Sequence, residues 1–435
     1  MQFHDVTDRL PLEGIEQMQA DLLSEMVHYV YERSSYYRRK FDLYGVKPPD
    51  IRGLYDIAKL PLTSREDLQR ENWDFLAVAK QDIAEIVSTT GSTGEPAFIA
   101  LTENDLKRLA CNEEKSFSLT GAGKEDSFHI AVTHDNLFIA GIAYYSGLLK
   151  LGSSVVRIGP QNAIRHVDLI GKLRPTGIVA VPTLMTQIVH YAHRNGMNVR
   201  ELGLEKIVLI GDAIRNSDFS TNSLGSMIED AFGKKCYSTY GITEGQVSFC
   251  ECAHRSGLHS HPDLVLAEVV DDEGRPLPDS EAGELVLTTL RIEGMPLIRY
   301  RTGDITFRIS GQCPCGRNSL RICSITGRKN QRLKIKGVTL YPKTIENAIL
   351  EIKEVVNYQI EAYTADDQTD HVRLWVGSHR NDSGLRSSLI ENLRAKARVS
   401  LKVRIESPDA VRKRLFENSI RKAVTFRDMR DIQYD

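Results

Sequence analysis

Four short apolar runs alternate with helix-like segments in the middle of the chain, and this alternation constrains the fold more than any other feature. The runs are residues 128–132, 154–158, 177–181 and 206–210, and residues 164–173 and 184–193 between them have the character of helices. Because strands that alternate with helices build parallel sheets, we predict an α/β fold with a layered sheet. Ligands bind such sheets at the carboxyl ends of the strands.

Length and charge exclude several classes of protein. The 435 residues are enough for two or three domains, and 41% hydrophobic with 26% charged residues is ordinary for a globular chain. A formal net charge of -2 argues against general binding to nucleic acid or to a membrane surface, since both need a marked basic excess. No stretch approaches the roughly 18 apolar residues of a spanning helix, and no signal sequence follows Met1. We therefore expect a cytoplasmic protein.

The N-terminal region is predicted to be helical over residues 15–45. It includes Tyr36 and Tyr37 beside a basic run, which could indicate a contact with RNA. We favour a helix that packs its tyrosines inward while its charges face water.

A loop rich in hydroxyl groups lies between two strand-like segments, residues 83–87 and 97–101. Glycine lets the backbone turn its amides towards a ligand and the hydroxyls add neutral donors, so such a loop can hold a polyphosphate. It leads into a strand rather than a Gly-Lys-Ser/Thr helix start, which excludes an ordinary P-loop. A polar hairpin turn is the alternative. The candidate phosphate ligands are Thr89, Thr90, Gly91, Ser92, Thr93 and Gly94.

A second candidate site follows the strand at 206–210. Gly211, Asp212 and Ala213 come directly after that strand, so they are predicted to lie at the mouth of a ligand site. A helix-entry turn capped by Asp212 would have the same residues.

The seven cysteines include two Cys-x-Cys pairs, which suggest a metal rather than disulfides. Thiolates and imidazoles at short spacing suit a tetrahedral Zn²⁺ with four protein ligands. The candidates outnumber the four places, and unrelated buried thiols with surface histidines are the alternative. They are Cys250, Cys252, His254, His259, His261, Cys313 and Cys315, whereas Cys111, Cys236 and Cys323 lack partners and are expected in the core.

The order of several motifs resembles the adenylate-forming superfamily, and within it the phenylacetate-CoA ligase family. The resemblance is carried by the loop of residues 89–96, by Tyr-Gly-x-Thr-Glu at 240–244 and by Tyr-Arg-Thr-Gly-Asp at 300–304. Two later stretches, a hinge-like one at 326–338 and a lysine-containing one at 416–424, follow in the same order as the corresponding motifs of the family. Glu95 stands where the family carries lysine. The resemblance implies a large layered N-terminal domain with mostly parallel sheets, residues 1–329, and a mobile C-terminal α+β lid, residues 330–435.

The family's motifs imply roles for individual residues. Tyr240 would stack on adenine, Gly241 would form the turn, Thr243 would contact phosphate and Glu244 would bind Mg²⁺. Asp304 would accept the ribose hydroxyls, and residues 89–94 would hold the phosphates. Gly211, Asp212 and Ala213 would lie against adenine and the acid.

The remaining positions concern the hinge, the acid and the metal. Arg328 and Asn330 fall in the hinge, with Asn330 as the pivot, and Lys422 matches the catalytic lysine of the lid. Phe138 and Tyr145 would wall the acid, with core packing as the alternative for each. Members of the resembled subfamily that carry zinc indicate Cys252, His259, Cys313 and Cys315 as its ligands, with Cys250, His254 and His261 in reserve.

The resemblance implies an acid-thiol ligase that forms AMP. It would use ATP and Mg²⁺ to convert a small carboxylic acid, expected to be aromatic, into acyl-AMP and pyrophosphate, and would then transfer the acyl group to CoA. A structural Zn²⁺ would pin a loop. A carrier-protein thiol or an amine as the acceptor, and a non-catalytic nucleotide-binding protein, are the alternatives. Close relatives are often dimers, so a homodimer is an open alternative to a monomer.

Overall fold

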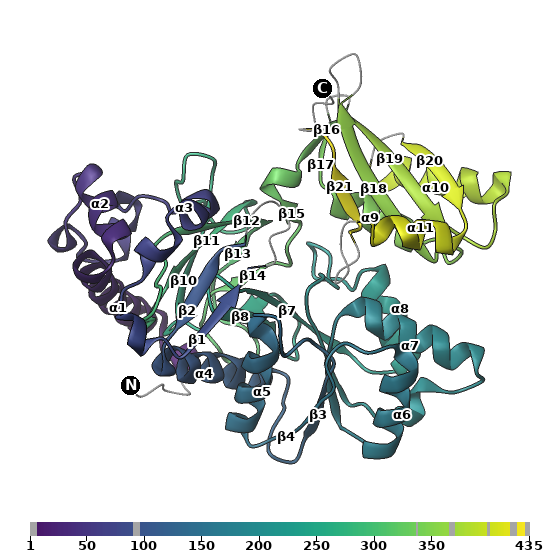
Figure 1. Ribbon diagram of the computed structural model, residues 1–435, viewed down its shortest axis with the longest axis horizontal. Coiled ribbons are helices and arrows are strands. Elements are labelled where there is room, and N and C mark those ends of the chain that lie inside the picture. Colours follow the sequence, from purple (N-terminus) through teal and green to yellow (C-terminus); the bar gives the residue numbers. More distant parts are fainter. Residues whose placement is uncertain are drawn as a thin grey trace. The chain divides into compact units, whose positions relative to one another are not determined.

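The computed structural model of the chain is shown in Figure 1. It describes residues 7–89, 96–335, 338–364, 370–397, 401–417 and 424–430. Contacts divide the chain into two compact units, which are described separately. The larger comprises Met1–Thr221 and Gly225–Ile325, and the smaller comprises Asn222–Leu224 and Thr326–Asp435.

The N-terminal helical region is split by a capping serine. The prediction of one helix over 15–45 is wrong, because α1 (Leu12–Arg33) ends at Ser34 and α2 (Ser35–Leu43) begins there. The backbone of Ser34 is extended, and its hydroxyl accepts a hydrogen bond from the Tyr37 amide, the usual role of an N-cap serine. Tyr36 and Tyr37 are buried, as predicted.

A nine-stranded sheet forms the centre of the larger unit, in the order β13-β14-β9-β8-β7-β6-β5-β3-β4. Strands β3 to β7 pair in parallel, whereas β8, β9, β14 and β13 add antiparallel strands beyond β7. The parallel strands are β3 (Ser127–Ile130), β4 (Ser154–Arg157), β5 (Gly177–Ala180), β6 (Lys206–Leu209) and β7 (Cys236–Ile242). The others are β8 (Val247–Glu251), β9 (Leu258–His259), β13 (Arg308–Ile309) and β14 (Arg321–Ile322). The predicted parallel α/β sheet is therefore present, and its antiparallel extension was not predicted.

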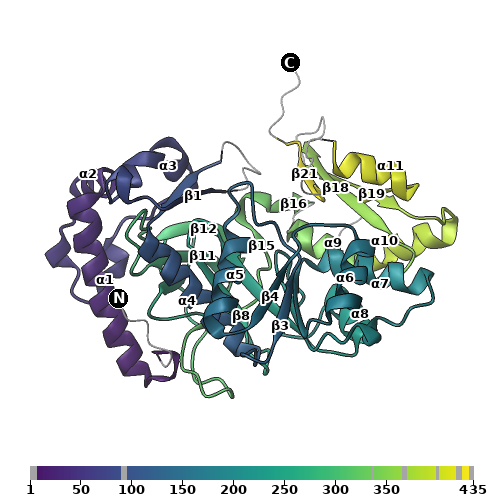
Figure 2. The same ribbon diagram turned by 60° about the horizontal axis from the view of Figure 1, so that its bottom comes forward.

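Helices cover both faces of the parallel strands. Figures 1 and 2 show α5 (Ile139–Leu151) on one face, with α6 (Ala163–Leu173) and α7 (Pro182–Arg194) on the other. The next helix is α8 (Ser223–Phe232). The strand order β4-β3-β5-β6-β7 reverses its direction of growth at β3. In doubly wound sheets this reversal marks the ligand crevice, outside the carboxyl ends of the strands on its two sides, here β3 and β5.

Helix α4 (Glu103–Leu119) is largely buried although one of its faces is polar. Asp105 accepts hydrogen bonds from the backbone amides of Glu293 and Gly294, both at 2.8 Å. Arg108 is fully buried and donates to the backbone carbonyls of Leu290, Gln246 and Leu264. Because these partners satisfy the polar groups, the helix can fasten three distant segments of the unit without exposing its polar face.

The remaining strands of the larger unit are antiparallel. They form the hairpin β1 (Glu85–Ser88) and β2 (Phe98–Leu101), and the ladder β10 (Val265–Val270), β11 (Gly283–Thr289) and β12 (Tyr300–Thr306). Figures 1 and 2 show α1 and α2 beside this ladder. Helix α3 spans Arg65–Arg70, and short 3₁₀ helices lie at Thr7–Arg9, Pro48–Asp50, Leu54–Lys59, Asn72–Phe75, Lys80–Asp82 and Val199–Leu202.

The smaller unit is an α+β sandwich around the sheet β20-β19-β18-β21. Its strands are β18 (Asn357–Thr364), β19 (Asp370–Gly377), β20 (Lys402–Glu406) and β21 (Phe426–Asp428). Residues of α9 (Pro342–Leu350) and α10 (Ser383–Ala397) share the main core with the sheet, and α11 (Pro408–Leu415) packs on Trp375 in a separate cluster. Shorter elements are β15 (Gly327–Arg328), the turn Lys329–Gln331, β16 (Leu333–Ile335) and β17 (Val338–Leu340). The predicted small α+β domain is thus present. No helix in the described part of the chain has the length and apolarity needed to cross a membrane.

Candidate functional site

Two residues predicted to bind nucleotide lie in direct contact. Tyr240 on β7 donates its hydroxyl to Oδ2 of Asp304 on β12 at 2.8 Å. Asp304 is buried and its amide donates to the Thr302 hydroxyl, while the Tyr240 ring packs 5.9 Å from that of Phe249. A phenol and a carboxylate that are 64 positions apart in sequence are therefore brought into direct contact.

The turn between β7 and β8 carries Thr243 and Glu244, both half-buried. The Tyr300 hydroxyl donates to Oε1 of Glu244 at 3.2 Å. Burial, together with the Glu244 carboxylate, raises the pKa of Tyr300 well above its usual value, so Tyr300 remains a donor. At the end of the same turn, the Gln246 carbonyl accepts from Arg108 at 2.9 Å. Hydrogen bonds from Tyr300 and Arg108 therefore fix the turn between β7 and β8.

The turn after β6 begins with Gly211, whose φ of 84° lies in the left-handed region that favours glycine. Gly211 is exposed, and Asp212 and Ala213 are half-buried. The turn lies at the carboxyl end of β6, as predicted. It leads directly into Arg215, whose side chain is only 1% exposed.

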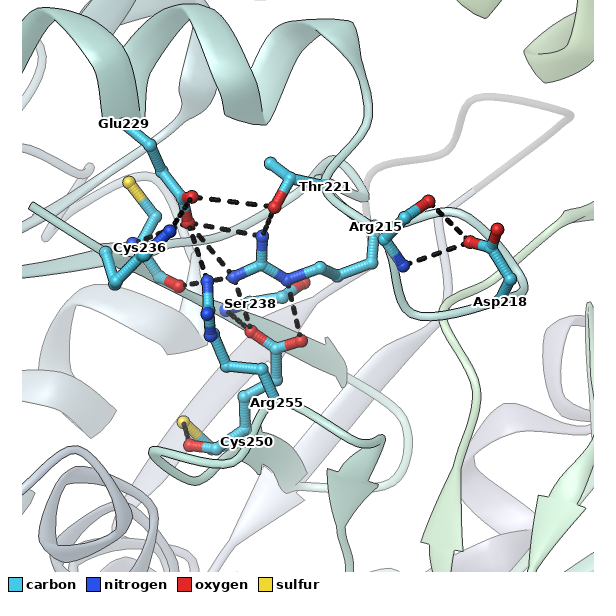
Figure 3. Close-up of polar contacts among 11 residues, drawn as sticks. Arg215, Asp218, Thr221, Glu229, Cys236, Ser238, Cys250 and Arg255 are labelled. Carbon is cyan, nitrogen blue, oxygen red and sulfur yellow. Dashed lines mark hydrogen bonds and ion pairs between the residues drawn. The ribbon is translucent and has the colours of Figure 1, made fainter.

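Arg215 is the centre of a buried ionic network that joins four segments (Figure 3). Its guanidinium donates to Glu229 on α8, to Glu251 on β8 at 3.1 Å, to the Thr221 hydroxyl and to the Cys236 carbonyl, the last two at 2.7 Å. All of its nitrogens have acceptors, as a buried guanidinium requires.

The two carboxylates extend this network to the strand that carries Tyr240. Glu251 accepts from the amide of Ser238 at 2.8 Å, and Glu229 accepts from the amide of Cys236 at 3.0 Å. Arg255 lies 3.4 Å from Glu229 and adds a second positive charge. Burial alone would raise the pKa of Glu229, but the Cys236 amide and Arg215 hold it below its usual value. The network therefore fixes β7 relative to the turn at Gly211.

The four preferred metal ligands converge. Their ligand atoms, from Cys252, His259, Cys313 and Cys315, all lie within 4.8 Å of one another. The Sγ atoms of Cys252 and Cys313 are 3.7 Å apart, and Sγ of Cys315 is 3.6 Å from Nε2 of His259. Zn–S and Zn–N bonds of about 2.3 and 2.0 Å in a tetrahedron require separations of this size.

The surroundings of the cluster also suit a metal. Nδ1 of His259 lies 3.1 Å from the Ser319 hydroxyl, an outer contact that orients a ligating imidazole. Three of the four side chains are buried. The reserve candidates Cys250 and His261 are buried outside this group, and His261 instead contacts Ser116 at 2.9 Å. Cys111, Cys236 and Cys323 are buried, as predicted.

The other predicted site residues belong to the β1–β2 hairpin, to the hinge and to the lid. The Thr89 hydroxyl accepts from the Ala97 amide at 3.0 Å, so it closes the β1–β2 hairpin. Arg328 and Asn330 are exposed, in β15 and in the following turn. Thr90, Gly91, Ser92, Thr93, Gly94, Glu95 and Lys422 lie outside the described residues.

The predicted walls of the acid site are the N-cap residue of α5 and a residue in the middle of this helix. Phe138 is its N-cap residue and is half-buried. Tyr145 packs against the core cluster around Phe128, and the Arg157 guanidinium lies 4.7 Å from its ring centroid. Part of Tyr145 therefore contributes to core packing.

Sequence analysis missed the arginines that hold these elements. From the sequence alone, Arg108 and Arg215 would be expected on the surface. Their hydrogen-bond acceptors come from distant segments, so no local pattern indicates that the two arginines are buried. The one available signal was position: Arg215 is four residues beyond the predicted ligand turn at Gly211.

Comparisons with known proteins agree with this geometry. A family model described as AMP-binding enzyme matches residues 38–291, and one described as AMP-binding enzyme C-terminal domain matches residues 337–430. The phenylacetate-coenzyme A ligase of Thermus thermophilus is 36% identical over 367 residues, which cover 83% of this chain and 81% of that protein. The enzyme of the same name from Pseudomonas putida is 30% identical over 399 residues, covering 89% and 88%. A crystal structure of 2-hydroxyisobutyryl-CoA ligase with an acyl adenylate has a TM-score of 0.85 at 21% identity, covering 97% of this chain and 91% of that one, which shows a shared fold.

Proposed function

The chain belongs to the AMP-binding enzyme family, among the phenylacetate-CoA ligases, and from this premise we propose how its own residues carry out the reaction. It is an AMP-forming acid–CoA ligase. It activates a carboxylic acid with ATP to give acyl-AMP and pyrophosphate, and it transfers the acyl group to CoA to give a thioester and AMP. The observation that best supports the proposed site is the 2.8 Å hydrogen bond between Tyr240 and Asp304.

The nucleotide is bound by residues from three strands or their ends. Tyr240 stacks on adenine, Asp304 accepts the ribose hydroxyls, and the turn at Gly211–Ala213 lies against adenine and the acid. The Tyr240–Asp304 contact supports these roles, because it places an aromatic ring and a buried carboxylate side by side.

Charge determines the rest of the mechanism. Joining a carboxylate to ATP brings two anions together, so the protein must align them and offset the charge that develops at the α-phosphate. Thr243 and residues 89–94 supply neutral donors for the phosphates, and Lys422 supplies the positive charge. Glu244 fits a hard divalent cation, because the hydroxyl of Tyr300 contacts Oε1 and, among the described residues, Oε2 is left as a ligand. Mg²⁺ bound there would neutralise phosphate charge.

The acyl group then passes to the thiol of CoA, which attacks the mixed anhydride and releases AMP. No nucleophile on the protein is required. We propose an aromatic acid as the substrate, by analogy with the relatives named phenylacetate-coenzyme A ligase.

The Cys252–His259–Cys313–Cys315 cluster is proposed to hold a structural Zn²⁺. Four ligands leave no open position, so the metal would fasten the segment after β8 to the loop at 313–315 rather than react. Cys252 directly follows Glu251 of the Arg215 network. A metal held there would therefore fix one end of β8, the strand that pairs with β7 beside Tyr240.

Two experiments test this function. The first is acid-dependent ATP–pyrophosphate exchange over a panel of aryl and short acyl acids, with thioester formation followed after addition of CoA. Exchange with at least one acid and thioester release are expected, whereas tight ATP binding without exchange for any acid would refute the proposal.

The second experiment tests the metal. Zinc analysis of the wild type should give about one equivalent, and Cys313→Ser should lose it and melt at a lower temperature. The matched control is Cys111→Ser, another buried cysteine outside the cluster, which should retain zinc. Equal zinc content in the two variants would exclude the cluster as the site.

A further inference from the structure

His134 has an imidazole without a partner. It lies in the connection between β3 and α5, and both ring nitrogens are shielded from solvent with no hydrogen-bond partner in the described ranges of the chain. An imidazole carries at least one N–H, and a buried donor without an acceptor costs free energy. To avoid this free-energy cost, the imidazole must form a hydrogen bond with a group that is not among the described residues.

The position of His134 indicates what kind of group that is. It is four residues beyond Ile130, the last residue of β3. The order β4-β3-β5-β6-β7 reverses at β3, and ligands of such sheets bind outside the carboxyl ends of the strands at this reversal. His134 is thus placed at the end of the sheet where the substrate is expected.

The backbone around His134 is fixed on two sides. A Cβ on Gly141 would lie 2.1 Å from the Thr133 carbonyl oxygen and 2.8 Å from Cα of His134, so only glycine lets α5 approach this closely. The carbonyl of Leu137 accepts from the amide of Ser88 at 2.9 Å. Leu137 itself has a φ of 60°, which is costly for a leucine and is maintained by these contacts. The side chain of His134 is therefore presented from a preorganised loop.

The charges that face His134 determine its chemistry. Burial, with the positive charge of Arg157 on β4, lowers the pKa of His134, and Asp135 acts in the opposite direction. The imidazole is consequently neutral near pH 7, with one donor and one acceptor nitrogen. A hydroxyl group can donate to the bare nitrogen or accept from the N–H, so it can bond to whichever ring nitrogen faces the acid. A carboxylate only accepts, and a methyl group does neither.

We propose that His134 hydrogen-bonds a hydroxyl group of the acid substrate, so that the enzyme activates a hydroxylated carboxylic acid in preference to the same acid without that group. This inference rests on the proposed function. The Arg157 guanidinium, whose charge acts on His134, also lies 4.7 Å from the ring centroid of Tyr145 on α5, the second residue expected to wall the acid.

The test uses matched acids. Each parent aryl acid is assayed with its derivatives that carry a hydroxyl or a methyl group at the same ring position, and kcat/KM is measured from pyrophosphate release. For at least one ring position, the wild type should favour hydroxyl over methyl by about tenfold or more, since a site built for a hydrogen bond discriminates strongly against analogues that lack it. His134→Leu should reduce this ratio to about one or below. His134→Gln, whose amide also donates and accepts, should retain most of the preference.

Thermal melting separates this role from a structural one. Because the imidazole has no partner in the described residues, His134→Leu should melt within a degree or two of the wild type. The ratio of kcat/KM for the hydroxylated acid to that for the methylated acid, measured within one variant, does not depend on how much of the enzyme is active. A wild type without hydroxyl preference, or a preference that persists in His134→Leu, would overturn the inference alone. A wild type that activates no acid would overturn the proposed function and the inference with it.

Discussion

Replacing Arg215 with methionine removes the centre of the ionic network while keeping a side chain of similar length. The side chains of Arg215, Glu229 and Glu251 are 1%, 8% and 2% exposed, so water cannot replace the lost cation. Glu229 keeps Arg255 at 3.4 Å, whereas among the described residues Glu251 keeps the Ser238 amide and no ion pair. Breaking a buried ion pair by removing one partner typically costs about 3–5 kcal/mol. Unfolding entropy scales with chain length, so for a unit of roughly 320 residues this corresponds to a fall in Tm of about 5–7 °C.

The loss of stability in Arg215→Met should depend on pH, and the titration of Glu229 determines whether it grows or shrinks as the pH falls. Its pKa is lowered in the folded state, so its contribution to stability is present above the unfolded pKa and is lost as the pH falls. The deficit of Arg215→Met should therefore be largest near pH 7 and should shrink towards pH 4. Unfolding in denaturant at several pH values, followed by circular dichroism, measures it.

The matched control is Arg165→Met. Arg165 pairs with Asp168 on the surface at 3.3 Å with its side chain 56% exposed, and such pairs contribute only about 0–1 kcal/mol. Adding Glu251→Gln to Arg215→Met removes one unpaired charge, so the double variant should be less unstable than the sum of the single variants. A loss below about 1 kcal/mol for Arg215→Met, or additive losses in the double variant, would refute the reasoning.

Two further outcomes are expected. Glu113 is buried on α4, and burial raises its pKa to about 7, so the stability associated with its protonated form is complete below about pH 4.5 and is lost as the pH rises through 7. The free energy of unfolding of Glu113→Gln, measured in denaturant, should therefore equal that of the wild type near pH 4.5 and exceed it by up to about 3 kcal/mol at pH 8. The same difference at both pH values would contradict this expectation. Tyr240→Phe keeps the ring but loses the bond to Asp304, so KM for ATP should rise by about fivefold or more with a smaller change in kcat, and an unchanged KM would argue against the proposed nucleotide contact.

Local patterns in the sequence predicted the elements that depend on local forces. The four apolar runs are strands β3 to β6, because strand formation there follows from apolar residues bounded by turn residues. The antiparallel strands β8, β9 and β14 were not predicted, since Cys250 pairs with His259 and His259 with Arg321 through contacts that no local spacing encodes.

The polar face of α4 illustrates the same limit. Asp105, Arg108, Asn112 and Ser116 follow helical spacing, which in sequence is typical of a solvent-exposed face, yet all four are buried. Only knowledge of their distant partners would distinguish the two cases. The Cys-x-Cys pairs indicated a metal site, but seven candidates competed for four places, and the family resemblance rather than the spacing indicated the four whose ligand atoms converge.

The partners of α4 also bear on the order in which the larger unit can be assembled during synthesis. The distant partners of Asp105 and Arg108 arrive 138 to 189 residues later in the chain, the last of them at Gly294. At about 5–20 residues per second, a nascent helix waits roughly 10–40 s on the ribosome before its last partner is made. Until then its charged face must stay in water, so the unit cannot close early around its N-terminal half, and a fragment that stops short of Gly294 should remain open.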